Sequence, residues 1–269
     1  MTFDVAADAY LRFMGRYSER LAQPFAALAD LAPGERVLDV GCGPGALTAR
    51  LVELVGAGAV SAVDPSASFV EAVRERLPGV DVHTGTAERL PFPDGTFGAA
   101  LAQLVVHFMT DAVAGLREMA RVTTPGGTVA TCLWDQEGDR WPLAVFSRAV
   151  RELGPPAPGE GRPAGAGAGA GAAVRAGVGA DRLADVFRAA GLAAPEESTV
   201  TVEASFAGFD DWWEPFTLGV GPAGDHVRGL DEVARTRLRD RCAALLPTGS
   251  FTLTASAVCV RARVPAPPG

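Results

Sequence analysis

Hydrophobic residues recur along this chain in two patterns, one typical of buried strands and one typical of amphipathic helices. Short apolar runs at 37–40, 59–64, 80–84, 97–104 and 128–134 predict strands, because such runs suit a strand covered on both faces. Apolar positions at helical spacing follow at 46–55, 66–77 and 111–122. Strands that alternate with helices predict a parallel, doubly wound sheet.

The pattern changes after residue 180. Asp181 is expected to cap a short helix that ends at Gly191, and two further strands are expected at 198–204 and 251–264. Residues 207–247 interrupt what would otherwise be a hairpin between these strands. The predicted fold class is α/β: a Rossmann-like, doubly wound, seven-stranded sheet, mostly parallel with an antiparallel C-terminal strand.

Three segments are expected to lie outside the core of this sheet. Residues 1–31 carry apolar positions at helical spacing before the first strand and predict a helical cap. Residues 154–180 are rich in Gly, Ala and Pro and bury little, so they predict a flexible linker loop. Residues 207–247 predict a helical lid within the C-terminal part, 181–269, which shares one domain with the core at 32–153.

Composition limits the class of protein. The chain has 269 residues, 48% of them hydrophobic, which suits one buried core. No apolar run approaches the roughly 18 residues of a membrane span, and the N-terminus lacks a signal pattern, so we expect a cytoplasmic protein without a membrane span. The four cysteines lack metal-ligand spacing and are expected to be separate, mostly buried thiols, with no metal site.

Charge points to a small-molecule partner. The formal net charge of −8 argues against nucleic acid, whose non-specific binding needs positive surface. All 24 basic residues counted as Lys or Arg are arginines, so a phosphate-binding loop with its lysine is absent. The sequence makes no prediction of the oligomeric state.

The most informative stretch is Val37 to Gly45, which reads V-L-D-V-G-C-G-P-G at a strand-to-helix junction. Glycine tolerates positive φ there and lets a ligand lie against the backbone beside the helix N-terminus. Gly41, Gly43 and Ala46 also satisfy the dinucleotide pattern, so a nucleotide-dependent oxidoreductase is an alternative. Asp64 ends the next strand, where an acidic side chain would bind ribose hydroxyls in either class.

Three segments together carry a resemblance: D-V-G-C-G-P-G at 39–45, V-D-P-S at 63–66 and G-T-A-E-R-L-P-F-P-D-G-T-F-G at 85–98. They resemble the class I S-adenosylmethionine (SAM)-dependent methyltransferases, in the small-molecule branch with the ubiquinone and menaquinone C-methyltransferases. The resemblance covers roughly residues 10 to 134. It implies SAM as cofactor, S-adenosylhomocysteine as product, and methyl transfer to O or C, less readily N, of a small metabolite.

The resemblance also implies roles for individual residues. Asp39 would hold the amino group of the cofactor, Asp64 its ribose, and Thr86 the edge of its adenine, although the family more often has Asp at that last position. The implied cofactor-binding residues are Asp39, Gly41, Cys42, Gly43, Gly45, Asp64, Pro65, Ser66, Thr86, Ala87, Glu88, Gln103, Tyr17 and Ser18. SAM carries no phosphate, so the absence of a phosphate-binding lysine fits this cofactor.

The acceptor side is less defined. His107 follows the fourth strand and is the candidate general base, with packing or helix capping as the alternative. Arg16 of the cap and the lid aromatics Trp212, Trp213 and Phe216 are candidate substrate contacts, with ordinary helix packing as the alternative. A SAM-binding protein without catalysis also remains open, and it would show a collapsed cleft beneath the two tryptophans.

Overall fold

The computed structural model describes residues 10–137, 139–154, 179–192 and 194–266. Its centre is a seven-stranded sheet in the order β3-β2-β1-β4-β5-β7-β6. Strand β7 runs antiparallel to both its neighbours and the other pairs are parallel, which confirms the predicted fold class. The strands are β1 (Val37–Val40), β2 (Val60–Asp64), β3 (Asp81–Thr84), β4 (Phe97–Gln103), β5 (Thr123–Trp134), β6 (Glu196–Phe206) and β7 (Phe251–Arg263).

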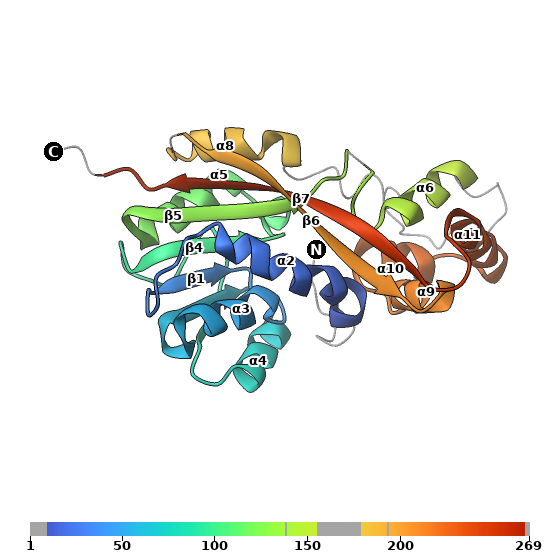
Figure 1. The fold of residues 1–269 in the computed structure, drawn as a ribbon, viewed down its shortest axis with the longest axis horizontal. Helices are drawn as coiled ribbons and strands as arrows, with labels where there is room; N and C mark the ends of the chain where they lie inside the picture. Colours follow the sequence, from blue (N-terminus) through green and yellow to red (C-terminus); the bar gives the residue numbers. More distant parts are fainter. Residues whose placement is uncertain (1–9, 138, 155–178, 193, 267–269) are drawn as a thin grey trace.

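Helices cover both faces of the sheet (Figure 1). One face carries α2 (Arg16–Ala27), which follows a π-helical turn η1 (Leu11–Gly15), with α3 (Ala46–Val55) and α4 (Ala67–Arg76). The other carries α5 (Ala112–Val122) and α8 (Leu183–Ala189). Beyond the long β6–β7 pair, a group of helices gathers at one end: α6 (Ala144–Leu153), α9 (Phe209–Thr217), α10 (Gly221–Arg228) and α11 (Glu232–Leu245).

The central strands are buried on both faces, as their continuous apolar runs predict. On β4, Ala99 and Leu101 face the α2–α3 side, while Ala100 and Ala102 face the α5–α8 side. Successive side chains of a strand point to opposite faces, so each strand contributes to two hydrophobic layers. Because helices cover both faces of these central strands, the carboxyl edge of the sheet is where a ligand can reach them.

Several predictions about local structure need correction. Asp181 does not cap α8: it lies in a 3-10 turn, and Arg182 holds the N-cap position. Strand β5 begins at Thr123, five residues before the predicted start, because Thr123 pairs with Phe97 ahead of a register shift. Helix α6 was not predicted, although Phe146 and Ala149 give it a buried stripe.

Two predicted segments lie partly or wholly outside the described residues. Of the predicted linker at 154–180, residues 155–178 lie outside the described residues. The part of the predicted cap before residue 10 also lies outside them. From Leu11 onward the cap is helical up to Ala27, as predicted. All four cysteines are buried free thiols, which agrees with the prediction from their spacing.

Candidate functional site

The glycine turn joins β1 to α3 with an unusual backbone. Gly41, Gly43 and Gly45 have φ values of +71°, +52° and +94°, a region that side-chain-bearing residues rarely adopt. A Cβ on Gly41 would lie 2.5 Å from a Cγ of Val105, so packing excludes any larger residue. A Cβ on Gly43 would meet nothing within 4 Å, so this position faces open space. Glycine is therefore required for packing at Gly41 and leaves room for a ligand at Gly43.

Asp64, the last residue of β2, fixes this turn from the neighbouring strand. Its two carboxylate oxygens accept 2.8 Å hydrogen bonds from the backbone N–H groups of Gly43 and Ser66. Burial raises the pKa of Asp64, and the two backbone donors oppose that rise. Each oxygen keeps a further lone pair, so the carboxylate can still accept hydrogen bonds from a ligand.

Asp39 lies beside it on β1 and has an unsatisfied oxygen. Oδ2 accepts a 2.6 Å hydrogen bond from the Thr48 hydroxyl, whereas the buried Oδ1 has no partner. Burial raises the pKa of Asp39 to about 7; the Thr48 bond opposes this rise and the charge of Asp64 adds to it. A buried carboxylate oxygen without a donor is an expected binding point for a cation or an N–H group.

These groups open into a cleft of about 400 Å³ at the carboxyl edge of β1, β2 and β4. The cap helix closes one side of it through Tyr10 and Ser18. The lining residues are Tyr10, Ser18, Asp39, Gly41, Cys42, Gly43, Pro44, Ala46, Leu47, Asp64, Pro65, Ser66, Ala67, Ser68, Phe69, Gln103, Leu104, Val105 and Phe108. Two carboxylates and no cationic side chain stand among these lining residues.

Gln103 ties the end of β4 to the cap helix. Its Nε2 donates a 3.0 Å hydrogen bond to the backbone oxygen of Ser18, and its buried Oε1 has no partner. The next residue, Leu104, has φ +62°, a conformation that non-glycine residues seldom adopt. Gln103 and Ser18, both sequence predictions, therefore meet at one end of the cleft.

The predicted cofactor-binding residues Thr86, Ala87 and Glu88 are not among the residues that line the cleft. Glu88 Oε1 instead accepts a 2.8 Å hydrogen bond from the backbone N–H of Thr110. Ala87 is buried in the layer under α5, and Thr86 is exposed. The segment after β3 turns toward the start of α5, which carries these side chains away from the ligand space.

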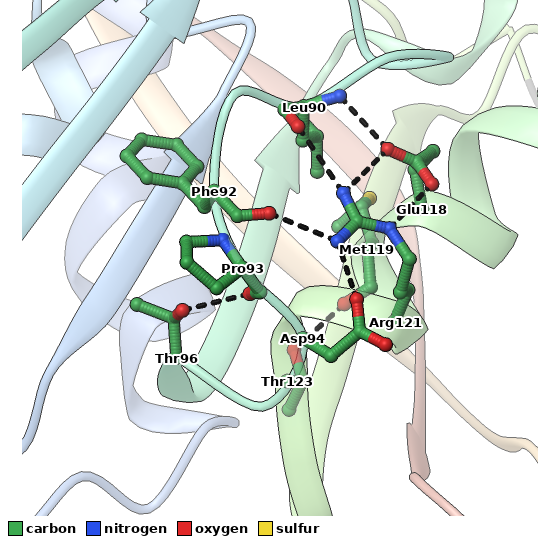
Figure 2. Close-up of polar contacts among 9 residues, drawn as sticks. All are labelled: Leu90, Phe92, Pro93, Asp94, Thr96, Glu118, Met119, Arg121 and Thr123. Carbon is green, nitrogen blue, oxygen red and sulfur yellow. Dashed lines mark hydrogen bonds and ion pairs between the residues drawn. The ribbon is translucent and has the colours of Figure 1, made fainter.

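The second half of the same motif has a structural role, shown in Figure 2. Arg121 of α5 donates to the backbone oxygens of Phe92 and Leu90, at 2.9 and 3.1 Å, and to Asp94 Oδ1 at 2.7 Å. Its Nε and one Nη also donate hydrogen bonds to the carboxylate of Glu118, at 2.7 and 2.8 Å. Glu118 in turn accepts a hydrogen bond from the backbone N–H of Leu90. The L-P-F-P-D loop is thus held onto α5 and is not a ligand site.

His107 does not face the cleft. It lies in the short 3-10 turn η3 (Val106–Phe108), where its ring centroid is 3.8 Å from that of Phe108, with the two planes tilted by 44°. Burial lowers the pKa of His107 to about 4, so it is neutral at pH 7 and a weak base. Phe108, 45% exposed, lines the cleft in its place.

Tyr17 and Arg16 of the cap also lie away from the cleft lining. Tyr17 is buried against Trp134 and Phe206. Arg16 donates a 2.8 Å hydrogen bond to Asp211 Oδ2, and its guanidinium lies 5.0 Å from the ring centre of Phe206. The predicted substrate contact Arg16 is therefore an ion-pair partner that joins the cap to α9.

The lid aromatics Trp212, Trp213 and Phe216 are buried and line no part of the cleft. Phe216 stacks on Phe146 of α6 at 4.8 Å and meets Phe13 edge-on at 5.2 Å. Their packing in one apolar cluster explains why they do not face a ligand: amphipathic helices bury such rings against each other.

Sequence reasoning missed several lining residues. Tyr10 and Phe69 meet edge-on at 5.5 Å across the cleft wall, and burial raises the pKa of Tyr10 to about 12. Phe69 and Phe108 carried no motif signal. The available hint was Tyr10 itself, a large aromatic residue on the same helical segment as Ser18.

The comparisons with known proteins agree with this geometry. Residues 37–127 match the family described as "Methyltransferase domain". A demethylmenaquinone methyltransferase from Mycobacterium sp. (strain KMS) is 43% identical over 104 residues, which are 38% of this chain and 43% of that protein. The chain thus spans less than half of the length of the curated relatives it matches.

Solved structures support the fold over nearly the whole chain. A candidate methyltransferase from Bacillus halodurans has a TM-score of 0.58 and 17% identity, covering 91% of this chain and 99% of its own. The geranyl diphosphate C-methyltransferase of Streptomyces coelicolor, solved with S-adenosylhomocysteine, has a TM-score of 0.52 and 15% identity, covering 93% of this chain and 80% of its own.

Residues 37–127 thus match a methyltransferase domain, and together with the sheet order this makes the core of the chain similar to the class I SAM-dependent methyltransferases, among them the demethylmenaquinone methyltransferases, with SAM as the cofactor of the class. Within the described ranges, no helix has the length and apolar character needed to cross a bilayer.

Proposed function

We propose that this protein holds SAM in the cleft and transfers its methyl group to an oxygen or carbon of a small organic metabolite. The observation that carries the proposal is the unpartnered Asp39 Oδ1, buried at the end of the cleft where Gly43 leaves open space. SAM has a cationic ammonium group and a sulfonium, so a cleft with two carboxylates suits its charge.

Each part of the cleft has a proposed role toward this cofactor. Asp39 takes the ammonium group, Asp64 takes the two ribose hydroxyls, and Gly43 leaves room for the methionine chain. Pro65 and Ser66 flank the adenine on the β2 side. When bound, SAM supplies a methyl group already activated by the sulfonium, so the protein mainly aligns the acceptor and excludes water.

The charge of the cleft also weighs against the oxidoreductase alternative. A nicotinamide dinucleotide carries a pyrophosphate, which proteins bind with cations or with a helix N-terminus. The α3 N-terminus is present, but the described lining residues offer two carboxylates and no arginine. The charge of the cleft therefore favours SAM over NAD as the cofactor.

The acceptor class is inferred from two observations. The chain lacks the N/D-P-P-Y/F signature of amide and exocyclic-amine methyltransferases after β4, and a curated relative is named for methylation of demethylmenaquinone. Both favour O- or C-methylation of an organic ring over N-methylation.

A second candidate function is SAM binding without catalysis. The buried packing of Trp212 and Trp213 is the feature that this alternative predicts. Turnover distinguishes the two candidates: incubation with methyl-labelled SAM and a metabolite extract transfers label to a small molecule only if the protein is an enzyme.

Calorimetric titration tests the cofactor site directly. We expect SAM and S-adenosylhomocysteine to bind and NAD not to bind. Asp64→Ala removes a carboxylate that bonds two backbone N–H groups and, in this proposal, two hydroxyls, so SAM binding weakens by about 2 to 3 kcal/mol. Asp81→Ala is the matched control, because Asp81 is an exposed acid on the adjacent strand β3. Wild-type SAM affinity in Asp64→Ala would refute the site.

A further inference from the structure

Two buried hydrogen-bonding groups in the hydrophobic layer between the cap helix and β5 have no partner in the fold. They are the hydroxyl of Tyr17 and the indole N–H of Trp134, on residues only 4% and 7% exposed. A buried group without a partner loses its hydrogen bonds to water without replacement, and folded proteins pair the large majority of such groups. Two unpaired groups on rings that contact each other therefore point to an atom that a ligand supplies.

The two residues contact each other from different elements. Their rings meet edge to face, with centroids 6.2 Å apart and an interplanar angle of 78°. Tyr17 lies on α2 directly before Ser18, which lines the cleft. Trp134 is the last residue of β5 and belongs to the same hydrophobic layer as Tyr17.

The sheet register places this pair beyond the methionine end of the cleft. Gln103, which lines the cleft, pairs with Cys132 on β5. Trp134 follows Cys132 by two residues on the same face, and strands rise about 3.3 Å per residue. It therefore lies one side-chain repeat further toward the carboxyl edge, where ligands of doubly wound sheets bind.

Building on the proposed function, we propose that Tyr17 and Trp134 form an oxygen-binding pair for the methyl acceptor. An indole N–H only donates, so its partner must be a hydrogen-bond acceptor. A hydroxyl or carbonyl oxygen has two lone pairs and can take both the indole N–H and the phenol O–H. The surrounding rings, such as Phe206 at 6.4 Å from Tyr17, suit an acceptor whose oxygen is carried on an apolar ring.

This pair would also activate the acceptor. Two donors on one enol or phenol oxygen stabilise negative charge there, which makes that oxygen or the adjacent carbon a better nucleophile. As the bond between the acceptor and the methyl carbon forms, the bond from that carbon to the sulfur of SAM would break and its electron pair would stay on sulfur, giving S-adenosylhomocysteine. The acceptor would lose one proton, from its oxygen or from the attacked carbon, to water. Both polar atoms are covered in this structure, so side chains that pack on the pair, such as Phe206 beside Tyr17, must move to admit the acceptor.

Binding of two ring probes to the protein saturated with S-adenosylhomocysteine tests the pair without relying on turnover. We expect 1-naphthol to bind about tenfold more tightly than naphthalene, the ratio that one or two buried hydrogen bonds give. Tyr17→Phe removes only the hydroxyl, and Trp134→Phe replaces the indole with a smaller aromatic ring that has no N–H; each should bring the ratio close to one. In nitrogen-15 spectra, 1-naphthol should shift the Trp134 indole resonance and naphthalene should not.

Thr131→Val is the matched control. Thr131 also lies on β5 with a buried, unpartnered hydroxyl, but it alternates with Cys132 and so faces the other side of the sheet. This variant should keep the tenfold ratio.

Several outcomes would overturn the pair. They are equal binding of both probes to the wild type, no binding of either, or a ratio unchanged in both Tyr17→Phe and Trp134→Phe. If Tyr17→Phe bound SAM more weakly and kept the ratio of 1-naphthol to naphthalene binding, the Tyr17 hydroxyl would belong to the cofactor site. That result would also overturn the pair. Failure of the wild type to bind SAM or S-adenosylhomocysteine, measured first, would instead refute the proposed function.

Discussion

At the scale of single residues, Asp39 couples cofactor binding to pH. Its carboxyl has a pKa raised to about 7 by burial, so near pH 6 the cleft holds mostly the neutral acid. The ammonium group of SAM pairs with the ionised form, so its binding favours proton release from Asp39.

We therefore predict that SAM affinity rises as the pH increases from about 6 to 8. In the free protein the direction is opposite: a carboxyl with a folded pKa above its unfolded value stabilises the fold at low pH, and that contribution is lost as the pH rises through about 7. Calorimetry across this range measures the binding effect, and Asp39→Asn should flatten it. An unchanged pH profile in that variant would exclude Asp39 as the group responsible.

A substitution at Gly43 tests whether the open space beside the glycine turn is where SAM binds. A Cβ there meets no protein atom within 4 Å, so Gly43→Val should fold while its side chain occupies the ligand space. The strain of a side chain at φ +52° costs about 1 kcal/mol of stability. We expect SAM binding to be lost and the circular dichroism spectrum to stay native.

Gly34→Val is a suitable control for that experiment. It also places a side chain at positive φ in open space, but Gly34 is not among the cleft residues. It should therefore bind SAM like the wild type. Retained binding in Gly43→Val would contradict the proposed path of the cofactor.

At the scale of elements, Arg121 joins α5 to the loop between β3 and β4. Its hydrogen bond to Glu118 is the largest cause of its raised pKa, and the same contact lowers the pKa of Glu118. The side chain of Arg121 is 31% exposed, so solvent screens part of this attraction. The geometry still matters, because a planar guanidinium can meet two carbonyls and two carboxylates together.

We predict that Arg121→Gln lowers the free energy of unfolding by about 2 kcal/mol, because loop carbonyls lose charge-assisted donors. SAM affinity should change little. Chemical denaturation measures the effect, with Arg188→Gln as the control, since Arg188 forms an exposed ion pair on α8. Unchanged stability in Arg121→Gln would mean that the loop is held by other contacts.

At the scale of the whole molecule, the aromatic rings of α9 connect the cap, α6 and the β6–β7 pair. Phe216 contacts Phe13 and Phe146, and Arg16 joins the cap to Asp211. Elements distant in sequence are thus packed through one apolar cluster, and an acceptor that enters here must displace part of it.

Phe216→Ala should therefore lower the free energy of unfolding by about 3 to 5 kcal/mol, the usual cost of removing a buried phenylalanine. SAM affinity should stay near the wild-type value, because Phe216 does not line the cleft. Thermal unfolding and titration measure the two effects. A stable variant with impaired methyl transfer would instead make Phe216 a substrate contact.

The sequence by itself determined the alternation of strands and helices from β1 to β5 and the position of the glycine turn. These features depend on local patterns: apolar periodicity sets the element type, and glycine allows the backbone at Gly41 and Gly43. Asp39 and Asp64 could be placed at the cleft for the same reason, since each lies on a strand beside that turn.

Only the tertiary structure decided which side chains further along the chain face the cleft. Tyr17 and Ser18 are consecutive on one helix, as His107 and Phe108 are in one turn, yet only Ser18 and Phe108 line the cleft. Neighbouring residues on a helix point in different directions, and packing against the sheet selects which of them faces inward. A local sequence pattern does not fix how a helix is rotated about its own axis against the sheet, so the side chain that faces the cleft follows only from the assembled fold.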